Sequence, residues 1–209
     1  MAGGVSVSIK NIDQILKEID KKKAGAETAL KRTLSDARKA APGIVADGVR
    51  TKYNIKKAEI TGGKVVKVRT EGTSLEDMKL IYSGRLLTPT HFGMTPKSPP
   101  AGKSYTLKAQ ILKGSKKAIG SYKTKRTPGG PYSAKSPFVL MGTGAARADG
   151  TAYIPFQRQA PGHRPTEGIR KMATVSVPQM ITNDDVAEVI QGKLSDKIKT
   201  RLDYHLSRV

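Results

Sequence analysis

Cysteine and tryptophan are absent from this chain of 209 residues, and the aromatic side chains amount to three Phe and seven Tyr. Without cysteine there can be no disulfide and no Cys-ligated zinc, which is compatible with assembly in a reducing cytoplasm. No run approaches the ~18 consecutive apolar residues that indicate a transmembrane helix. Residues 1–4 have neither the basic nor the apolar region of a signal peptide. We therefore expect no signal peptide and no membrane partner.

Acidic side chains are also scarce, because 17 Asp and Glu stand against 38 Lys and Arg, a net charge of +21. Residues 50–130 hold 18 of the basic and four of the acidic side chains, so 14 of the 21 net charges lie there. Solubility needs a net charge of only about 2–8. The excess therefore predicts a polyanion or an acidic protein surface as a partner.

The N-terminal region, about 11–53, is predicted to be helical. An alternation of valine and serine over 5–9 predicts a short strand before it. Apolar residues at helical spacing then predict one helix over 11–23 and a longer one over 24–53. Pro42 should kink or break the longer helix, since proline cannot donate an intrahelical hydrogen bond.

One face of the longer helix is rich in alanine, which permits close packing against a flat partner, either a sheet or a neighbouring subunit. The residues of this face are Ala26, Ala29, Ala37, Ala40 and Ala41. The apolar fraction of the chain is low, at 37%. A modest core beside such a face suggests that burial is completed between subunits, for which a closed ring is the ordinary arrangement.

The basic middle of the chain, about 64–160, is predicted to be β-rich because its apolar residues alternate. The expected strands include Val66 and Val68, Leu80 and Tyr82, Tyr105 to Ile111, Phe138 to Met141, and Tyr153 to Phe156. Segments 88–103 and 113–136 are rich in Gly, Pro, Ser and Lys and are longer than ordinary connections. We expect 113–136 to be a flexible loop that becomes ordered only against a partner.

A C-terminal helix is predicted over about 183–208. Its apolar residues, from Val186 to Leu206, recur every four positions. Asn183 or Thr182 should cap it, with acidic residues in the first turn, where the helix dipole favours them. Just before it, we interpret the alternation of Val175 and Val177 as a strand that Pro178 ends. Together these elements, helices on one side of a run of alternating strands with extended loops between them, predict an α+β protein of one domain, 1–209.

Patterns typical of catalysis or cofactor binding are weak. His91, His163 and His205 are far apart in the sequence, and Asp184-Asp185 lies at a helix start, where capping explains it. The other acidic residues are dispersed, which disfavours a two-metal site. We therefore predict that the chain is not an enzyme, with no catalytic residue, cofactor or metal.

If the chain contacts nucleic acid, lysine and arginine should touch phosphates without reading sequence, because so few aromatic rings could stack on bases. The candidates for a contact with DNA or with a partner ring are the basic residues of the 113–136 loop. They are Lys113, Lys116, Lys117, Lys123, Lys125 and Arg126. A solvated loop without a contact role is the alternative interpretation of the same residues.

The C-terminal third carries a resemblance to a known family. It contains His163-Arg-Pro-Thr-Glu-Gly-Ile169, then Thr174-Val-Ser-Val-Pro-Gln-Met180, and a helix that ends Arg201-Leu-Asp-Tyr-His-Leu206. This run resembles the minor tail protein Z family of tailed phages. The alanine-rich helix, the segment 49–60, and Ser83-Gly-Arg-Leu-Leu87 followed by His91-Phe92 are similar too. The segments 113–136 and 142–150 match no pattern of that family.

The resemblance implies an α+β fold in which the long N-terminal helix packs on an antiparallel sheet. It also implies a structural virion protein of the phage neck, assembled in the cytoplasm of a bacterial host. It implies a homo-oligomeric ring, hexameric in that family, that completes the tail and helps join it to the head connector. The implied partners are tail terminator or tail tube proteins, head-completion or connector proteins, and the backbone of genomic DNA. A sequence-nonspecific basic nucleic-acid-binding protein remains the alternative, and a phage hydrolase would need a catalytic cluster that is not evident.

Overall fold

The structure is a computed structural model of the whole chain, and it confirms the α+β class, with two long helices and three antiparallel sheets. The residues that it describes are 3–9, 25–63, 65–122, 137–141, 153–158 and 169–208. The helix expected over 11–23 lies outside them.

The backbone gathers into two compact units, where the sequence led us to expect one domain. Unit 1 combines the two ends of the chain, Met1–Arg85 and Ser176–Val209, and unit 2 is the continuous segment Leu86–Val175 between them. Unit 1 holds both long helices and one sheet, whereas unit 2 holds the other two sheets. The N-terminal and C-terminal regions, far apart in the sequence, therefore complete the same unit.

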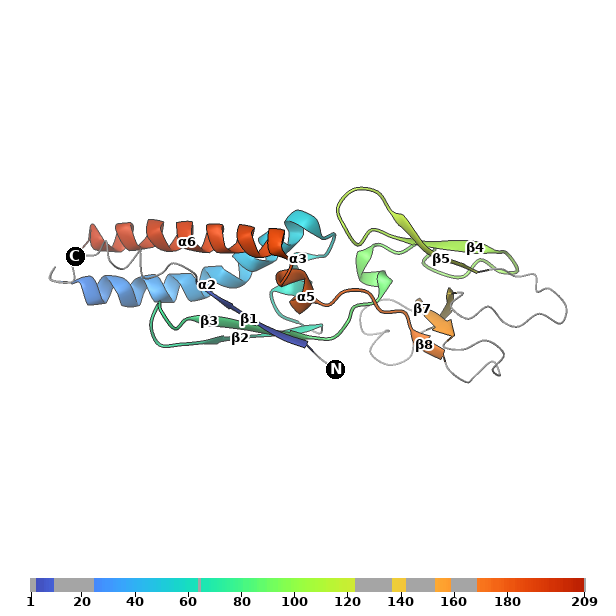
Figure 1. Cartoon of the computed structure of the whole chain (residues 1–209), viewed down its shortest axis with the longest axis horizontal. Coiled ribbons are helices and arrows are strands. Elements are labelled where there is room, and N and C mark those ends of the chain that lie inside the picture. Colours follow the sequence, from blue (N-terminus) through green and yellow to red (C-terminus); the bar gives the residue numbers. More distant parts are fainter. Residues whose placement is uncertain are drawn as a thin grey trace. The chain divides into compact units, whose positions relative to one another are not determined.

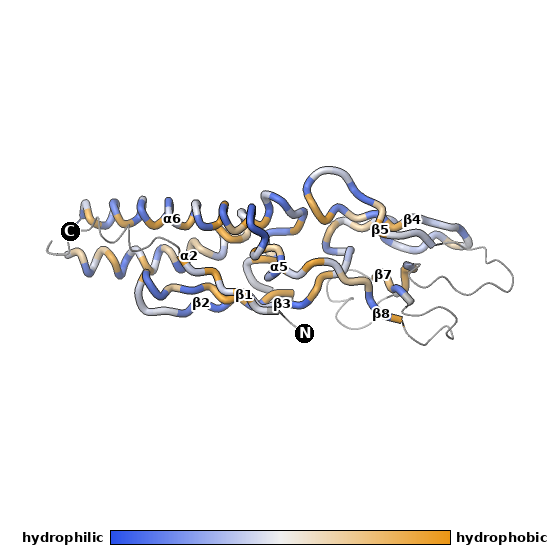
Figure 2. Tube along the Cα trace, viewed as in Figure 1, coloured by the Kyte–Doolittle hydropathy of each residue, from blue (hydrophilic) through white to orange (hydrophobic). Residues whose placement is uncertain are grey.

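Two antiparallel helices, α2 (Ala26–Lys52) and α6 (Asp184–Leu206), lie side by side in unit 1 (Figure 1). Both bury a stripe with a four-residue step: Ala29, Thr33, Ala37, Ala41, Val45 and Val49 on α2, and Val186, Ile190, Leu194, Ile198 and Leu202 on α6. Figure 2 shows apolar residues recurring along α6 on the side toward α2. Small side chains thus face large ones, which lets the two helices approach closely.

The closest approach is at Gly48 of α2, since a Cβ built there would lie 2.4 Å from Cγ1 of Ile190. Any side chain at this position would push the helices apart, which is a physical reason for glycine inside a helix. At one end of the helix pair, Lys52 donates hydrogen bonds to Asn183 Oδ1 at 2.9 Å and Asp185 Oδ2 at 2.5 Å. Asn183 therefore stands at the N-cap of α6 with its side-chain oxygen bonded to Lys52, while its own side chain makes no capping bond.

Two expectations about α2 change. Pro42 was expected to kink or break the helix; α2 is continuous through Pro42, so the break does not occur. Burial of Ala37, Ala41 and Val45 on both sides of the proline offsets the cost of proline inside a helix, about 3 kcal/mol for the lost hydrogen bond and the clash of the ring together. Ala26, Ala29, Ala37 and Ala41 are buried within the chain, so this face supplies no argument for burial between subunits.

The sheet of unit 1 has the order β1-β3-β2, formed by β1 (Gly3–Ser8), β2 (Val66–Glu71) and β3 (Lys79–Gly84). Leu80 lies opposite Val7, and Tyr82 lies between Val5 and Val68. These inward residues alternate with outward Lys79 and Ile81, as the period of two predicts. Arg38 of α2 donates to the carbonyl of Gly72 in the β2–β3 turn, which ties the helix to the sheet.

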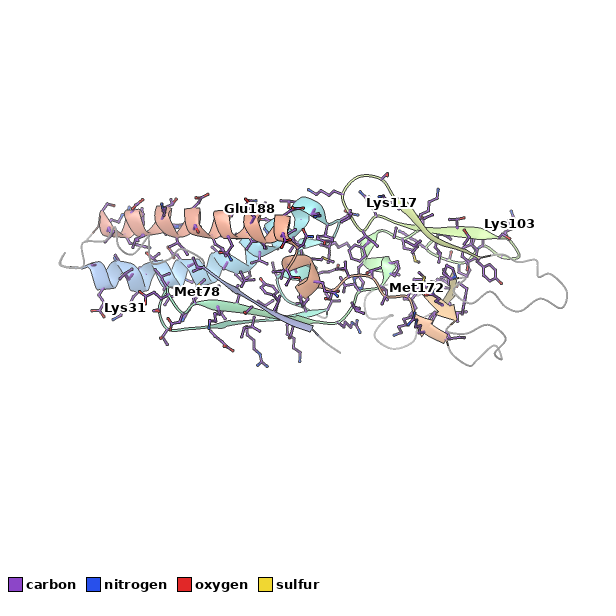
Figure 3. All side chains as sticks on the ribbon, in the orientation of Figure 1. Lys31, Met78, Lys103, Lys117, Met172 and Glu188 are labelled. Carbon is purple, nitrogen blue, oxygen red and sulfur yellow. The ribbon has the colours of Figure 1, made fainter. Side chains whose placement is uncertain are left out.

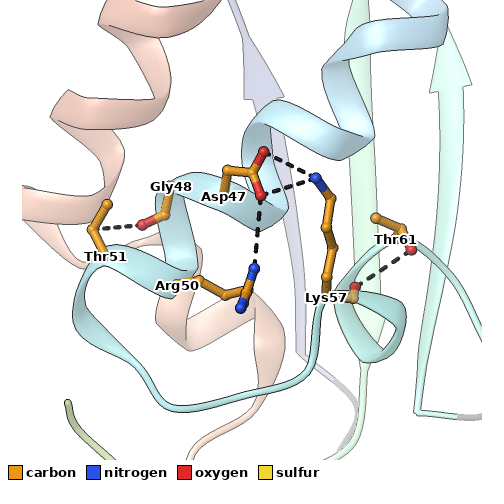
Figure 4. Close-up of polar contacts among 6 residues, drawn as sticks. All are labelled: Asp47, Gly48, Arg50, Thr51, Lys57 and Thr61. Atoms are coloured by element: carbon orange, nitrogen blue, oxygen red, sulfur yellow. Dashed lines mark hydrogen bonds and ion pairs between the residues drawn. The ribbon is translucent and has the colours of Figure 1, made fainter.

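The end of α2 is held by a small ion-pair cluster that Figure 4 shows in close-up. Lys57, in the short helix α3 (Lys57–Ile60), lies 2.9 Å from Asp47, and Arg50 lies 4.0 Å from the same carboxylate. Thr51 donates to the carbonyl of Gly48 at 2.7 Å. The three charged side chains are about half exposed, so the cluster orients the turn after α2 more than it stabilises the fold.

The segment before α6 corrects our interpretation of Val175 and Val177 as a strand. Ser176 is the N-cap of a short helix, α5 (Val177–Ile181). Its hydroxyl accepts from the backbone N–H of Gln179, and the Gln179 side chain accepts from the backbone N–H of Ser176, which is a capping box. Pro178 fits the first turn of a helix because its missing N–H would have no intrahelical partner there.

Unit 2 contains a two-stranded sheet, β4 (Tyr105–Ala109) with β5 (Lys117–Tyr122). Its three-stranded sheet has the order β6-β7-β8, formed by β6 (Pro137–Met141), β7 (Tyr153–Arg158) and β8 (Ile169–Lys171). A 3-10 turn, η1 (Pro89–Phe92), precedes β4. A core of Met94, Leu107 and Val139 lies between these elements, with Tyr105, Ile119, Tyr153 and Met172 packed against it.

The expected loop 113–136 is partly wrong. Residues 117–122 form strand β5, paired with β4, and residues 123–136 lie outside the described part of the chain. The loop expected over 88–103 contains η1. Strand β8 and helix α3 were not expected from the sequence.

Candidate functional site

The positive charge divides unequally between the two units. Unit 2 carries 15 Lys and Arg against two Asp and Glu, a net charge of +13, whereas unit 1 carries 23 against 15, a net charge of +8. The two acidic residues of unit 2, Asp149 and Glu167, lie outside the described residues. The described part of unit 2 therefore has nine Lys and Arg and no carboxylate that could neutralise them.

Ion pairs hold many of the charges of unit 1. Asp36 on α2 lies 3.0 Å from Nε2 of His205 and 3.7 Å from Nε of Arg201, both on α6. The hydrogen bond from His205 is the main cause that lowers the pKa of Asp36, and Arg201 adds to it. At the other end of the helix pair, the Lys52 ammonium lowers the pKa of Asp185, and that carboxylate raises the pKa of Lys52. These charges stabilise contacts inside the unit.

The β4–β5 hairpin shows how unit 2 is built. Leu107 and Ala109 of β4 point into the core, while Thr106 and Lys108 point outward. Tyr105 and Tyr122 lie opposite each other and stack, with ring centroids 5.1 Å apart. The Tyr105 hydroxyl accepts a hydrogen bond from the backbone N–H of Val139 at 3.0 Å, and burial raises the pKa of that hydroxyl. One side of the hairpin therefore packs in the core and the other side is exposed.

A bulge and a close contact position strand β5. The register shifts between Leu107 and Lys108, which puts Gly120 opposite Leu107. A Cβ built on Gly120 would lie 2.3 Å from Cγ of Pro137 at the start of β6. Because only glycine fits there, β5 can approach β6 closely and the hairpin packs against the three-stranded sheet.

The turn between β4 and β5 has its own supports. Thr95 and Lys108 exchange both backbone hydrogen bonds at 2.8 Å, and Gln110 donates its backbone N–H to the carbonyl of Phe92 at 2.9 Å. The side chain of Gln110 donates to the carbonyl of Gly114 at 2.6 Å, across the turn. The backbone that carries the lysines of the turn is therefore anchored to β4 and to η1.

The structure describes three of the six candidate contact residues. Lys113 and Lys116 lie in the β4–β5 turn and Lys117 begins β5, and all three are exposed. Lys123, Lys125 and Arg126 lie outside the described residues. Sequence reasoning missed Lys103 and Lys108, which are exposed before and on β4. Figure 3 shows Lys103 and Lys117 toward opposite ends of the hairpin.

The residues considered for catalysis lie in a turn or in contacts between helices where the structure describes them. His91 lies in η1, His205 contacts Asp36, and His163 is outside the described residues. Asp184 and Asp185 form the first turn of α6, where Asp185 pairs with Lys52. Within the ranges that the structure describes, no group of three or more His, Cys, Asp or Glu is placed to hold a metal ion. Those ranges also contain no helix long and apolar enough to span a membrane.

Comparisons with known proteins give no relative. No family model, no curated protein and no solved structure matches this chain.

Proposed function

We propose that the chain is a non-enzymatic structural subunit of the head–tail junction of a tailed phage, where it completes the tail and helps join it to the head connector. The observation that carries the proposal is the segregation of charge. A net charge of +13 is concentrated in unit 2, whose described part has no carboxylate, while unit 1 has a net charge of +8 and pairs some of its charges across its helices. A junction subunit needs such a division, because one part must hold a fixed fold while another meets highly charged neighbours.

The residues that carry the resemblance to the minor tail protein Z family support the proposal through their positions. Ser176 and Gln179 form the capping box of α5, and Arg201 and His205 both contact Asp36. Two of these residues therefore begin helix α5, and the other two join α6 to α2. A resemblance in such residues concerns the fold of unit 1, which makes it a meaningful support for a shared architecture.

In the proposed assembly, copies of the chain form a closed ring, hexameric as the resemblance implies, between the tail tube or terminator and the head-completion or connector proteins. The cationic surface of unit 2 then faces either the DNA that passes through the bore or acidic surfaces of adjoining rings. The protein is located in the virion neck and is assembled in the bacterial cytoplasm. No substrate is turned over and no cofactor is needed.

The experiment is mass measurement of the purified chain, alone and with purified tail tubes, together with a search for the chain in purified virions. We expect a discrete ring, or a discrete complex with tail tubes, and a fixed copy number in the virion. Loss of the chain should leave filled heads and tails that fail to join. A chain that stays monomeric with tail tubes and is missing from virions would refute the proposal.

The second candidate is a sequence-nonspecific nucleic-acid-binding protein, and the lack of carboxylates in the described part of unit 2 favours it. Such a protein would bind free duplex or RNA tightly at low salt and would coat it without forming rings. Its affinity would fall steeply as the salt concentration rises. Ring formation in the absence of nucleic acid distinguishes the two candidates.

A further inference from the structure

Five exposed lysines follow the β4–β5 hairpin, and we name this set the lysine ribbon. Its members are Lys103, Lys108, Lys113, Lys116 and Lys117. Lys108 points outward because its neighbours Leu107 and Ala109 occupy the core side of β4. Lys116 lies beside η1, since a Cβ built on Gly93 would come 4.0 Å from its Cε. The hydrogen bonds of Gln110 and Thr95 hold the backbone between these lysines.

The side chains between the lysines are small. The exposed residues of this kind are Ser104, Thr106, Gly114, Ser115, Ala118 and Ser121. Thr106 and Ser121 lie opposite each other and their hydroxyl oxygens are 3.0 Å apart. The short polar side chains of this pair do not extend far from the strands. The outward side of the two strands therefore carries small side chains around Lys108. Lys117 lies opposite Ala109, so it leaves the hairpin on the other side, at the exposed end of β5.

The composition of the ribbon favours a phosphate backbone over a protein surface. The cores of protein interfaces are enriched in aromatic residues, Met and Arg, and are depleted in Lys. The ribbon has five Lys and no Arg, and Leu112, which is 44% exposed, is the large apolar side chain among them. Lysine is a flexible point charge, which suits contacts with phosphates that do not depend on sequence.

The aromatic residues of the hairpin disfavour recognition of single strands. Stacking on bases needs accessible rings. Tyr105 and Tyr122 instead stack on each other, and the Tyr105 hydroxyl is bonded to the backbone of β6. The exposed side of the hairpin offers charge and hydroxyls, which suits a double helix whose bases are already stacked.

The dimensions of the hairpin are compatible with a duplex. Strand β4 has five residues, and at ~3.4 Å per residue it spans about 17 Å. Duplex DNA presents one phosphate charge per ~1.7 Å of its axis, so about ten phosphates lie within that span. Five lysines spread along and beyond the strand can each meet a phosphate without competing for the same one.

We propose that the lysine ribbon is a sequence-independent contact surface for the phosphates of double-stranded DNA. The inference deepens the proposed function, on which it rests for the source of the DNA, the genome that passes the junction. The affinity itself is a property of the isolated chain. It can therefore be measured without any other phage protein.

The test is fluorescence anisotropy of the full chain with labelled duplexes of about 30 base pairs, in two unrelated sequences, between about 50 and 200 mM salt. The ribbon variant is Lys103→Gln, Lys108→Gln, Lys113→Gln, Lys116→Gln and Lys117→Gln. The matched control removes five exposed lysines of unit 1, as Lys39→Gln, Lys67→Gln, Lys79→Gln, Lys193→Gln and Lys199→Gln. The two variants have the same formal net charge and differ in where the charge was removed.

We expect the unchanged chain to bind both duplexes equally and to lose affinity steeply with salt. Each phosphate contact contributes about 0.9 to the slope of log K against log salt, so the ribbon variant should lower that slope by about 4. Its affinity at the lowest salt should fall at least about tenfold, while the control should change the slope by less than about 1. Circular dichroism and thermal melting verify that both variants remain folded.

Each of the following results would overturn the inference: no duplex binding by the unchanged chain, equal losses of affinity in the two variants, or a clear preference for one sequence. If the ribbon variant instead keeps DNA binding but loses an acidic junction protein, the ribbon is a protein contact and the inference is wrong. Presence in the virion and ring formation are measured separately. The proposed function can therefore survive when the DNA contact fails, and the DNA contact can survive when the proposed function fails.

Discussion

Unit 1 and unit 2 differ in how their cores are built and in how their charges are balanced. In unit 1, two long helices bury matching stripes, and opposite charges meet across them, as between Lys52 and Asp185. In unit 2, short strands surround a small core of Met94, Leu107 and Val139, and the described residues carry positive charge only. The comparison leads us to expect that unit 1, where buried stripes and opposite charges meet, contributes more to the free energy of unfolding than unit 2. The described part of unit 2 keeps charges that no carboxylate among its described residues neutralises.

The largest effect that would sharpen this comparison is expected from Leu194→Ala in the buried stripe of α6. Leu194 is 1% exposed, so truncation should leave a cavity and lower the free energy of unfolding by about 3 kcal/mol. Urea denaturation followed by circular dichroism measures the change. The matched control is Leu140→Ala in unit 2, where the leucine is 44% exposed and the change should stay within about 0.5 kcal/mol. If both variants lowered the free energy of unfolding equally, the conclusion that burial between α2 and α6 matters more than the exposed leucine of unit 2 would be wrong.

A smaller effect is expected from Gly48→Ala, and its sign is informative. Alanine in a helix interior normally stabilises by about 1 kcal/mol relative to glycine. Here the new Cβ would meet Cγ1 of Ile190 at 2.4 Å, so we expect destabilisation by about 2 kcal/mol in the same urea assay. Gly192→Ala on α6, where a Cβ meets nothing within 4 Å, should instead stabilise. Two changes of the same sign would show that the close helix contact at Gly48 is wrong.

The capping box of α5 should contribute less. Ser176→Ala removes the hydroxyl that accepts from the backbone N–H of Gln179, which should cost about 1 kcal/mol of stability. Ser115→Ala, in the exposed β4–β5 turn of unit 2, is the control and should be close to neutral. Thermal melting of both variants measures the difference. Equal melting temperatures would contradict a stabilising role of the capping box.

The smallest expected effect is the dependence of the stability of unit 1 on pH. The pKa values of Asp36 and Asp185 are lowered in the folded state, mainly by hydrogen bonds from His205 and Lys52. A carboxylate with a lowered pKa stabilises the fold above its unfolded pKa of about 4, and that contribution is lost as the pH falls through its folded pKa. Urea midpoints should therefore decrease from about pH 5 downward.

In the double variant Asp36→Asn and Asp185→Asn, the urea midpoint should depend less on pH in the acidic range. Near neutral pH, the urea midpoint of this variant should be lower than that of the unchanged chain. The reason is that both ion pairs are then absent at every pH. Hydrogen exchange resolved by residue distinguishes the units, since the described part of unit 2 has no carboxylate to titrate. If protection from hydrogen exchange is lost first in the β4–β5 hairpin as the pH falls, the expected difference between the units is wrong.

Periodicity predicted most of the elements correctly. Alternation identified β1, β2, β3, β4, β6 and β7, and helical spacing identified α2 and α6. Strand β5 was missed because Lys117 to Tyr122 mixes lysine, glycine and serine and has no clean alternation. Helix α5 was missed because Val175 and Val177 mimic a period of two. The Ser176-x-x-Gln179 spacing of a capping box was present in the same letters and could have found it.

The candidate site was predicted in part. The excess of positive charge and the exposed lysines Lys113, Lys116 and Lys117 could be identified from composition and turn residues alone. Lys108 was overlooked, although the alternation of Tyr105, Leu107 and Ala109 already places it on the outward side of the strand. Lys103 precedes β4, and the structure alone shows that it is exposed. The division between +13 and +8 also follows the tertiary boundaries of the units, which no local pattern marks.

By itself the sequence determined the α+β class, the positions of the long helices and the scarcity of negative charge, because these depend on spacing and composition along the chain. Only the tertiary structure decided what covers the alanine face of α2. The sequence allowed a sheet or a neighbouring subunit, and the structure places α6 there, from the opposite end of the chain. The physical reason is that periodicity shows which side of a helix is apolar, whereas the partner depends on contacts between residues distant in sequence.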